Sequence, residues 1–209
     1  MSPESSLHSP LKIGVILFPG FELIDVFGPL EMFGLLGEKA SIITLAEKPG
    51  LVAARGGPRV LEEFSLAEVG WLDVFLVPGG SGSRQEVANL PFLELLRQSA
   101  DRAGIVASVC TGSALLARAG ILNGRKATSN KIAWDWVVAQ GPEVLWMRKA
   151  RWVEDGNIFT SSGISAGMDM TLALIARVLG RSSAEAIARQ AEYLWNEDSA
   201  ADPFANGIE

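Results

Sequence analysis

Short apolar runs recur along the chain, and each ends at glycine, proline or a small polar residue. The clearest runs span residues 11–18, 74–77 and 104–109. They are rich in Ile and Val and show almost no polar alternation, which is typical of strands that are buried on both faces. The pattern therefore predicts strands of a sheet that is covered on both sides.

Stretches with helical spacing lie between and after these runs. Apolar residues recur at helical spacing around 92–96 and 114–117, and again over 165–179 and 182–195. Strands that alternate with helices form parallel sheets with helices on both faces. Two β-hairpins interrupt the alternation, one over 52–61 and one over 152–159, the second centred on an Asp-Gly turn. The expected class is α/β, with a mostly parallel sheet and added hairpins.

Composition indicates how the chain is divided. It has 209 residues, of which 48% are hydrophobic, and this favours one compact domain with a sizeable core. Neither an internal repeat nor a low-complexity linker interrupts it. We expect one domain over 11–195, a disordered N-terminal tail over 1–10, and an irregular, polar C-terminal tail over 196–209.

Charge and rare residue types exclude several functional classes. The net charge is −6 and no run of Lys and Arg exceeds Arg148-Lys149, so neither nucleic acid nor an anionic membrane is an expected partner. No apolar stretch reaches the ~18 residues that cross a bilayer. The single cysteine, Cys110, and the single histidine, His8 in the N-terminal tail, cannot form a disulfide, a zinc site or a Cys-His catalytic pair. The sequence favours a reduced, cytoplasmic protein without a metal.

The residues that follow the apolar runs are the first place to look for chemistry. In open parallel sheets, ligands bind beyond the carboxyl ends of the strands. This gives three segments, 19–29, 78–83 and 110–113, which we expect to converge at one edge of the sheet. Thr128-Ser129-Asn130 is a fourth segment that could border the same pocket.

Cys110 lies where a predicted strand turns into a predicted helix. Gly112 and Ser113 are small enough for the sharp corner of a nucleophile elbow, although Ser108 stands where the hydrolase motif has glycine. A thiol at a helix N-terminus faces the positive end of the helix dipole, so we expect a lowered pKa and a nucleophilic thiolate. The alternative is an inert, buried cysteine.

Two further features lie at the same predicted edge. Gly79 and Gly80 offer backbone N–H groups that can stabilise developing negative charge, or they form an ordinary tight turn. Asp25 lies in an apolar stretch, which disfavours its charged form and suits a proton-transfer role where no histidine is at hand. The alternative for Asp25 is a helix N-cap ahead of Pro29, and Glu22 is a competing, more solvated candidate.

Four segments together resemble the DJ-1/PfpI (ThiJ) superfamily, and within it the isocyanide hydratase branch. They are FPGFELIDVFGP at 18–29, VPGG at 77–80, SVCTGSALLARAG at 108–120 and SSGISAGMD at 161–169, and they occur in the family's order. The resemblance runs from about residue 11 to residue 195. It implies a flavodoxin-like α/β sandwich, usually a homodimer, with a reactive cysteine at the elbow and no cofactor.

Carried over residue by residue, the resemblance implies that Cys110 is the nucleophile and that Asp25 is the acidic residue hydrogen-bonded to it. The pair Gly79-Gly80 matches the glycine-rich loop whose amides face the site. Thr111 matches the residue after the nucleophile, and Ile164 lies in the segment that packs beside the cysteine. The protease and amidase branch has histidine where this chain has Thr111, which argues against peptidase activity.

The expected activity is cofactor-free addition of water to an isocyanide. The Cys110 thiolate attacks the isocyanide carbon to give a covalent thioimidate, and water then releases an N-substituted formamide while Asp25 shuttles protons. The amides of Gly80 and Thr111 are expected to orient the substrate or the water. Two alternatives use the same cysteine: glyoxalase- or deglycase-type chemistry, and a non-enzymatic module that senses oxidation or binds a ligand. The expected partners are a small-molecule substrate and a second copy of the chain.

Overall fold

The fold is built around one large sheet. The computed structural model describes residues 10–205, and within that range six strands form the sheet in the order β2-β1-β5-β6-β10-β9. Their bounds are β1 Leu11–Leu17, β2 Ala40–Ala46, β5 Leu72–Val77, β6 Ala103–Val109, β9 Trp152–Asp155 and β10 Ile158–Ser161. Neighbouring strands are parallel except for β9, which pairs antiparallel with β10 at one edge. The predicted class, a flavodoxin-like α/β fold, is confirmed.

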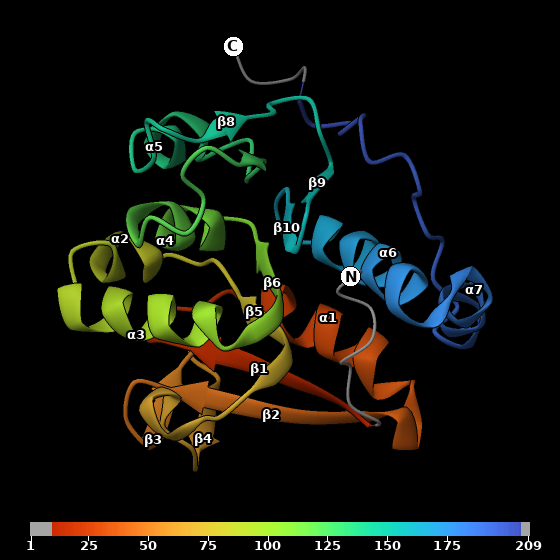
Figure 1. The fold of residues 1–209 in the computed structure, drawn as a ribbon, viewed down its shortest axis with the longest axis horizontal. Coiled ribbons are helices and arrows are strands. Elements are labelled where there is room, and N and C mark those ends of the chain that lie inside the picture. The colour runs from red at the N-terminus through yellow and green to blue at the C-terminus, as the bar shows by residue number, and fades with distance from the viewer. Residues whose placement is uncertain (1–9, 206–209) are drawn as a thin grey trace.

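Helices cover both faces of this sheet (Figure 1). α3 packs with α4 on one face and α1 packs with α6 on the other, while α7 packs against α6. The bounds are α1 Leu23–Gly34, α2 Ser83–Glu86, α3 Leu90–Asp101, α4 Gly112–Arg118, α5 Trp134–Val138, α6 Ala166–Leu179 and α7 Arg181–Gln190, with short 3-10 turns η2 Gly37–Lys39 and η3 Leu66–Glu68. Every residue of β5 is buried, including the apolar run 74–77 from which the strand is predicted and Asp73 before it.

The strand order brings the predicted site segments to one edge of the sheet. The chain runs from β1 to β2 on one side and later returns to β5 on the other side of β1. In such sheets the helices after the strands diverge at this switch point, which opens a crevice beyond the carboxyl ends. The segments that follow β1, β5 and β6 therefore lie side by side.

Both predicted hairpins are present, and two smaller features go beyond the sequence pattern. β3 (Gly50–Ala53) pairs with β4 (Arg59–Glu62), and β9 turns into β10 at Asp155-Gly156. The sequence pattern predicts neither β2 nor the small parallel pair of β7 (Lys126–Ala127) and β8 (Leu145–Trp146). β2 is an edge strand whose side chains are mostly half-buried, so its apolar signal is weak.

The helix α1 is not among those that the sequence pattern predicts, and α7 is shorter than predicted. α1 begins before Pro29 and continues through it, because Val26, Met32 and Phe33 on its inner face are buried. α7 ends at Gln190 and not at residue 195, since Glu192 has a positive φ of 49°. The chain after this kink turns back across α6.

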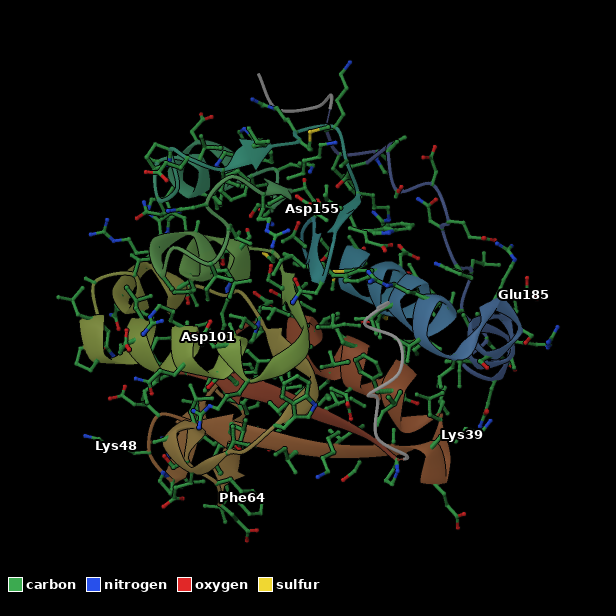
Figure 2. The ribbon with its side chains drawn as sticks, viewed as in Figure 1. Lys39, Lys48, Phe64, Asp101, Asp155 and Glu185 are labelled. Carbon is green, nitrogen blue, oxygen red and sulfur yellow. The ribbon has the colours of Figure 1, made fainter. Side chains whose placement is uncertain are left out.

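Many charged side chains lie at the periphery of the molecule, although a few are buried. Figure 2 shows Lys39, Lys48 and Glu185 at its rim, and all three are exposed. Among the described residues, none of the helices combines the length and the apolar character needed to cross a bilayer. Except for Pro10, the predicted tail over 1–10 lies outside the described residues, and the described part of the C-terminal tail, 196–205, holds neither helix nor strand.

Candidate active site

Cys110 occupies a strained corner between β6 and α4. Its φ is 57°, in the left-handed region that residues with a side chain rarely adopt. Its N–H donates to the carbonyl oxygens of Ser161 at 3.3 Å and Ser162 at 3.2 Å. Its own carbonyl accepts from Ser113 Oγ at 3.1 Å and Ser129 Oγ at 2.8 Å. Hydrogen bonds on both sides of the residue therefore hold the elbow that the sequence predicts.

Asp25 points from the first turn of α1 toward this corner. Its side chain is fully buried, Oδ2 accepts from the Gly79 N–H at 2.9 Å, and the carboxyl hydrogen-bonds to the Cys110 thiol. Oδ1 finds no nitrogen or oxygen donor in the described part of the chain. The N-cap alternative for Asp25 is wrong, because Glu22 holds the N-cap position of α1. Glu22 is half-buried and pairs with Arg55 at 2.9 Å.

The surroundings of Asp25 favour its neutral form. Burial raises the pKa of the carboxyl from 3.8 to about 7, the nearby charge of Glu22 adds to the rise, and the hydrogen bond from Gly79 opposes it. Near neutral pH the group therefore exchanges a proton readily. This is the property that a proton-transfer residue needs.

The predicted lowering of the Cys110 pKa is wrong for the resting site. Burial raises the pKa of the thiol, the negative charge of Asp25 raises it further, and hydrogen bonds from the Thr111 and Ile164 N–H groups and the Asn130 side chain oppose the rise. The short helix α4 does not outweigh the loss of water around the sulfur. When Asp25 takes up a proton its charge disappears, so the two groups titrate as a coupled pair.

The glycine-rich loop after β5 packs directly against the elbow. A Cβ at Gly79 would lie 2.5 Å from Thr111 N and 2.9 Å from Asp25 Oδ2, so only glycine fits there. Gly80 N–H donates to Thr111 Oγ1 at 3.0 Å, and Ser83 Oγ lies 3.0 Å from the same oxygen. Both loop amides are therefore engaged within the site. The expectation that the Gly80 amide orients substrate is not met.

The amides that do face the sulfur come from Thr111 and Ile164. Ile164 has a φ of 49° and is 39% exposed, so its backbone is held in a strained form beside the thiol. Asn130 reaches the sulfur from the segment that the sequence flags as a pocket border. The structure thus brings together all the predicted site residues, and the donors that face the sulfur are Thr111, Ile164 and Asn130 instead of Gly80.

A cavity of about 460 Å³ lies next to Asn130 and Ile164, two residues that hydrogen-bond to the Cys110 thiol, although Cys110 is not part of its lining. It shares Asn130 and Ile164 with the surroundings of Cys110, which is itself 6% exposed. Its lining comprises Asn130, Lys131, Ile132, Ser162, Gly163, Ile164, Ser165, Pro203 and Phe204. The sequence pattern gives no sign of Lys131 or of the C-terminal residues in this lining. Within residues 10–205 no group of three His, Cys, Asp or Glu side chains is placed to hold a metal.

Fold and site together define a class: an α/β protein with a lone thiol at a strand-to-helix elbow, hydrogen-bonded to a buried carboxyl group. The chain belongs to the DJ-1/PfpI family, whose model matches residues 11–177. The family predicted from the four sequence segments is thereby confirmed.

Relatives within this family have different roles. An isonitrile hydratase of Pseudomonas putida is 33% identical over 94% of this chain and 82% of its own length. The HTH-type transcriptional regulator GbdR of Pseudomonas aeruginosa is also 33% identical, over 89% of this chain, but the match spans only 52% of the regulator. The crystal structure of a ThiJ/PfpI family protein from Pseudomonas syringae superposes with a TM-score of 0.82 and 28% identity, covering 100% of this chain and 84% of that one.

Proposed function

We propose that this protein is a cofactor-independent isocyanide hydratase that converts an isocyanide and water into an N-substituted formamide. The observation that carries the proposal is the buried Cys110–Asp25 pair, with the N–H groups of Thr111 and Ile164 and the Asn130 side chain directed at the sulfur. The similarity to an isonitrile hydratase supports it. We further propose a cytoplasmic homodimer, in which Cys110 stays reduced.

The first step forms the carbon–sulfur bond. Asp25 takes the thiol proton, and the thiolate, stabilised by the three donors around it, attacks the terminal carbon of the isocyanide. The carbon gains negative charge as the bond forms, and Asp25 returns the same proton to it. The product is a thioimidate in which the former isocyanide carbon bears sulfur, hydrogen and a double bond to nitrogen.

The second step returns the enzyme to its resting state. Water adds to the thioimidate carbon while Asp25 takes one of its protons and passes that proton to nitrogen. The tetrahedral adduct then expels the Cys110 thiolate and becomes the formamide. As the thiolate leaves, Asp25 takes the proton of the new hydroxyl group and passes it to sulfur, so a proton from water replaces the thiol proton that went to carbon in the first step. A carboxyl group whose pKa is about 7 suits both the giving and the taking of that proton.

The substituent on the isocyanide nitrogen needs an apolar space beside the sulfur. The cavity of about 460 Å³ offers the exposed side chains of Ile132, Ile164 and Phe204 for this purpose. An isocyanide carries no charge, and therefore needs no cationic clamp. A small aryl or alkyl group is the substituent we expect.

The deciding assay incubates purified protein with p-nitrophenyl isocyanide and measures the formamide. We expect turnover by the wild type, and none by Cys110→Ala or Cys110→Ser. Phe64→Ala serves as a control, because Phe64 is 53% exposed and does not line the cavity. Formamide production by Cys110→Ala at the wild-type rate, or none by a folded wild-type protein, refutes the proposal.

A second candidate function is a non-catalytic sensing module. The observation that favours it is the match to a transcriptional regulator over 89% of this chain. In that case isocyanides are not consumed, and mild peroxide converts Cys110 to an oxidised form. Intact-mass measurement before and after peroxide, run beside the formamide assay, separates the two candidates.

A further inference from the structure

The C-terminal segment 196–205 returns to the candidate active site. Ser199 O accepts from the Arg151 N–H at 2.8 Å, and Lys149 O accepts from the Asp202 N–H at 2.8 Å. The next two residues, Pro203 and Phe204, line the cavity that also borders Asn130 and Ile164. A segment without helix or strand therefore supplies part of the cavity lining.

Asp202 anchors this segment in the protein interior. Its side chain is fully buried, with Oδ2 at 3.8 Å from Lys131 Nζ and Oδ1 at 4.0 Å from Arg151 Nη1. Oδ1 also accepts from the Phe204 N–H at 2.9 Å, so the same carboxylate sets the backbone of the cavity residue. The two cations face this buried carboxylate, so removing its charge would leave them without their counter-charge.

A second buried carboxylate holds the start of the segment. Asp169 in α6 binds Arg151 through Oδ2 at 2.6 Å, and its Oδ1 accepts from the Tyr193 hydroxyl at 3.0 Å and the Asn196 N–H at 2.9 Å. Arg151 therefore lies between Asp169 and Asp202. The segment is fixed at both ends by one network of buried charges.

Phe204 is the residue of this segment best placed to meet a ligand. It lines the cavity yet remains 65% exposed, so the folded chain gains little from burying it. Its ring has free apolar surface next to the space in which a substituent must fit. The hydrogen bond from its N–H to Asp202 holds the Phe204 backbone at this place beside the cavity.

We propose that residues 196–205 form a fixed wall of the substrate cavity, with Phe204 setting the size of the substituent that can reach Cys110 and Asp202 acting as its positioning residue. The substrate class in this proposal rests on the proposed function. The position of residues 196–205 at the cavity does not depend on which substrate the protein takes. A reagent that attacks any accessible thiol therefore tests the wall separately.

The test compares two thiol reagents of different size on the only cysteine of the chain. Iodoacetamide is the small reagent and N-phenylmaleimide the bulky one, and each labelling rate is followed by intact mass at one pH. We expect Phe204→Ala to raise the ratio of bulky to small labelling rates by about tenfold, because small changes in pocket size discriminate on this scale. Phe64→Ala, which removes another exposed ring outside the cavity lining, is expected to leave the ratio unchanged.

Asp202→Asn tests the anchor. The amide oxygen can still accept from Phe204 N–H, but the charge facing Lys131 and Arg151 is lost, so the wall loosens and the ratio rises in the same direction. A wild-type ratio in both Phe204→Ala and Asp202→Asn, or a lower ratio in Phe204→Ala, overturns the wall. The same variants are also assayed with methyl and p-nitrophenyl isocyanide. If neither substrate gives formamide while the labelling ratio is shifted, the hydratase proposal is rejected and the proposal that residues 196–205 form a wall stands.

Discussion

Replacing Asp25 by Asn is expected to stabilise the protein at alkaline pH while it removes the proposed activity. The carboxyl is fully buried and its pKa is raised from 3.8 to about 7. Between these two values the folded state holds a proton that the unfolded state has released. Stability therefore falls as pH rises through this range, and it stops falling above the folded-state pKa. The amide introduced by Asp25→Asn cannot ionise and escapes this loss, while its oxygen can still accept from the Gly79 N–H.

The size of the effect follows from the same two pKa values. These pKa values give the free energy of proton binding in the folded and unfolded states. Between pH 5 and pH 8 the free energy of unfolding of the wild type therefore falls by about 2.5 kcal/mol, and that of Asp25→Asn does not share this fall. For a domain of this length that corresponds to a relative Tm shift of about 5–10 °C. The window ends at pH 8 because ionisation of Cys110 in the unfolded chain adds a further pH dependence above it.

Urea unfolding at pH 5, 6, 7 and 8 measures the difference directly. Asp135→Asn is the matched control, since Asp135 is an exposed carboxylate in α5 and its removal leaves the buried pair intact. The unfolding free energy of Asp25→Asn minus that of the wild type must rise steadily from pH 5 to pH 8. Parallel curves for the two proteins would show that Asp25 ionises as easily in the fold as in the unfolded chain, and the account of the site would fail.

Three further outcomes follow from the site and its surroundings. The kcat/KM for isocyanide hydration is expected to rise with increasing pH through an apparent pKa near 7, because Asp25 must be deprotonated to accept the thiol proton. A flat profile from pH 5 to pH 8 contradicts that role. Gly79→Ala places a Cβ within 2.5 Å of Thr111 N, so we expect turnover to be lost and the free energy of unfolding in urea to fall by about 1–3 kcal/mol. Unchanged kinetics would mean that the loop moves without disturbing the site. Arg151→Leu leaves Asp169 buried without its 2.6 Å partner and is expected to lower the free energy of unfolding by about 3–5 kcal/mol. A loss below about 1 kcal/mol in the same measurement would mean that the Asp169 carboxylate is in contact with water.

The sequence predicts the elements of this site well where the signal is local. Each of the apolar runs that form β1, β5 and β6 is followed by one site residue, namely Asp25, Gly79 and Cys110. The carboxyl ends of these parallel strands lie at one edge of the sheet. β2 is missed because it lies at the edge of the sheet, where half-burial allows polar residues such as Thr44. Pro29 suggests a helix boundary by its own chemistry, but the burial of Phe33 and its neighbours carries α1 through it.

What depends on distant contacts cannot be predicted from the sequence. A thiol next to a helix start indicates a low pKa, yet the burial of Cys110 and the charge of Asp25 reverse the direction. Both effects arise from segments far away in the chain. The same holds for Lys131 and Asp202, since no spacing rule relates a lysine in the middle of the chain to an aspartate near its end.

The left-handed backbone at Cys110 has an evolutionary consequence. Glycine adopts a φ of 57° without penalty, whereas a residue with a side chain gives up about 1–3 kcal/mol there. Directed evolution for thermal resistance alone is therefore expected to favour loss of the thiol at this corner. Persistence of cysteine at position 110 under such a regime requires a concurrent demand for its chemistry.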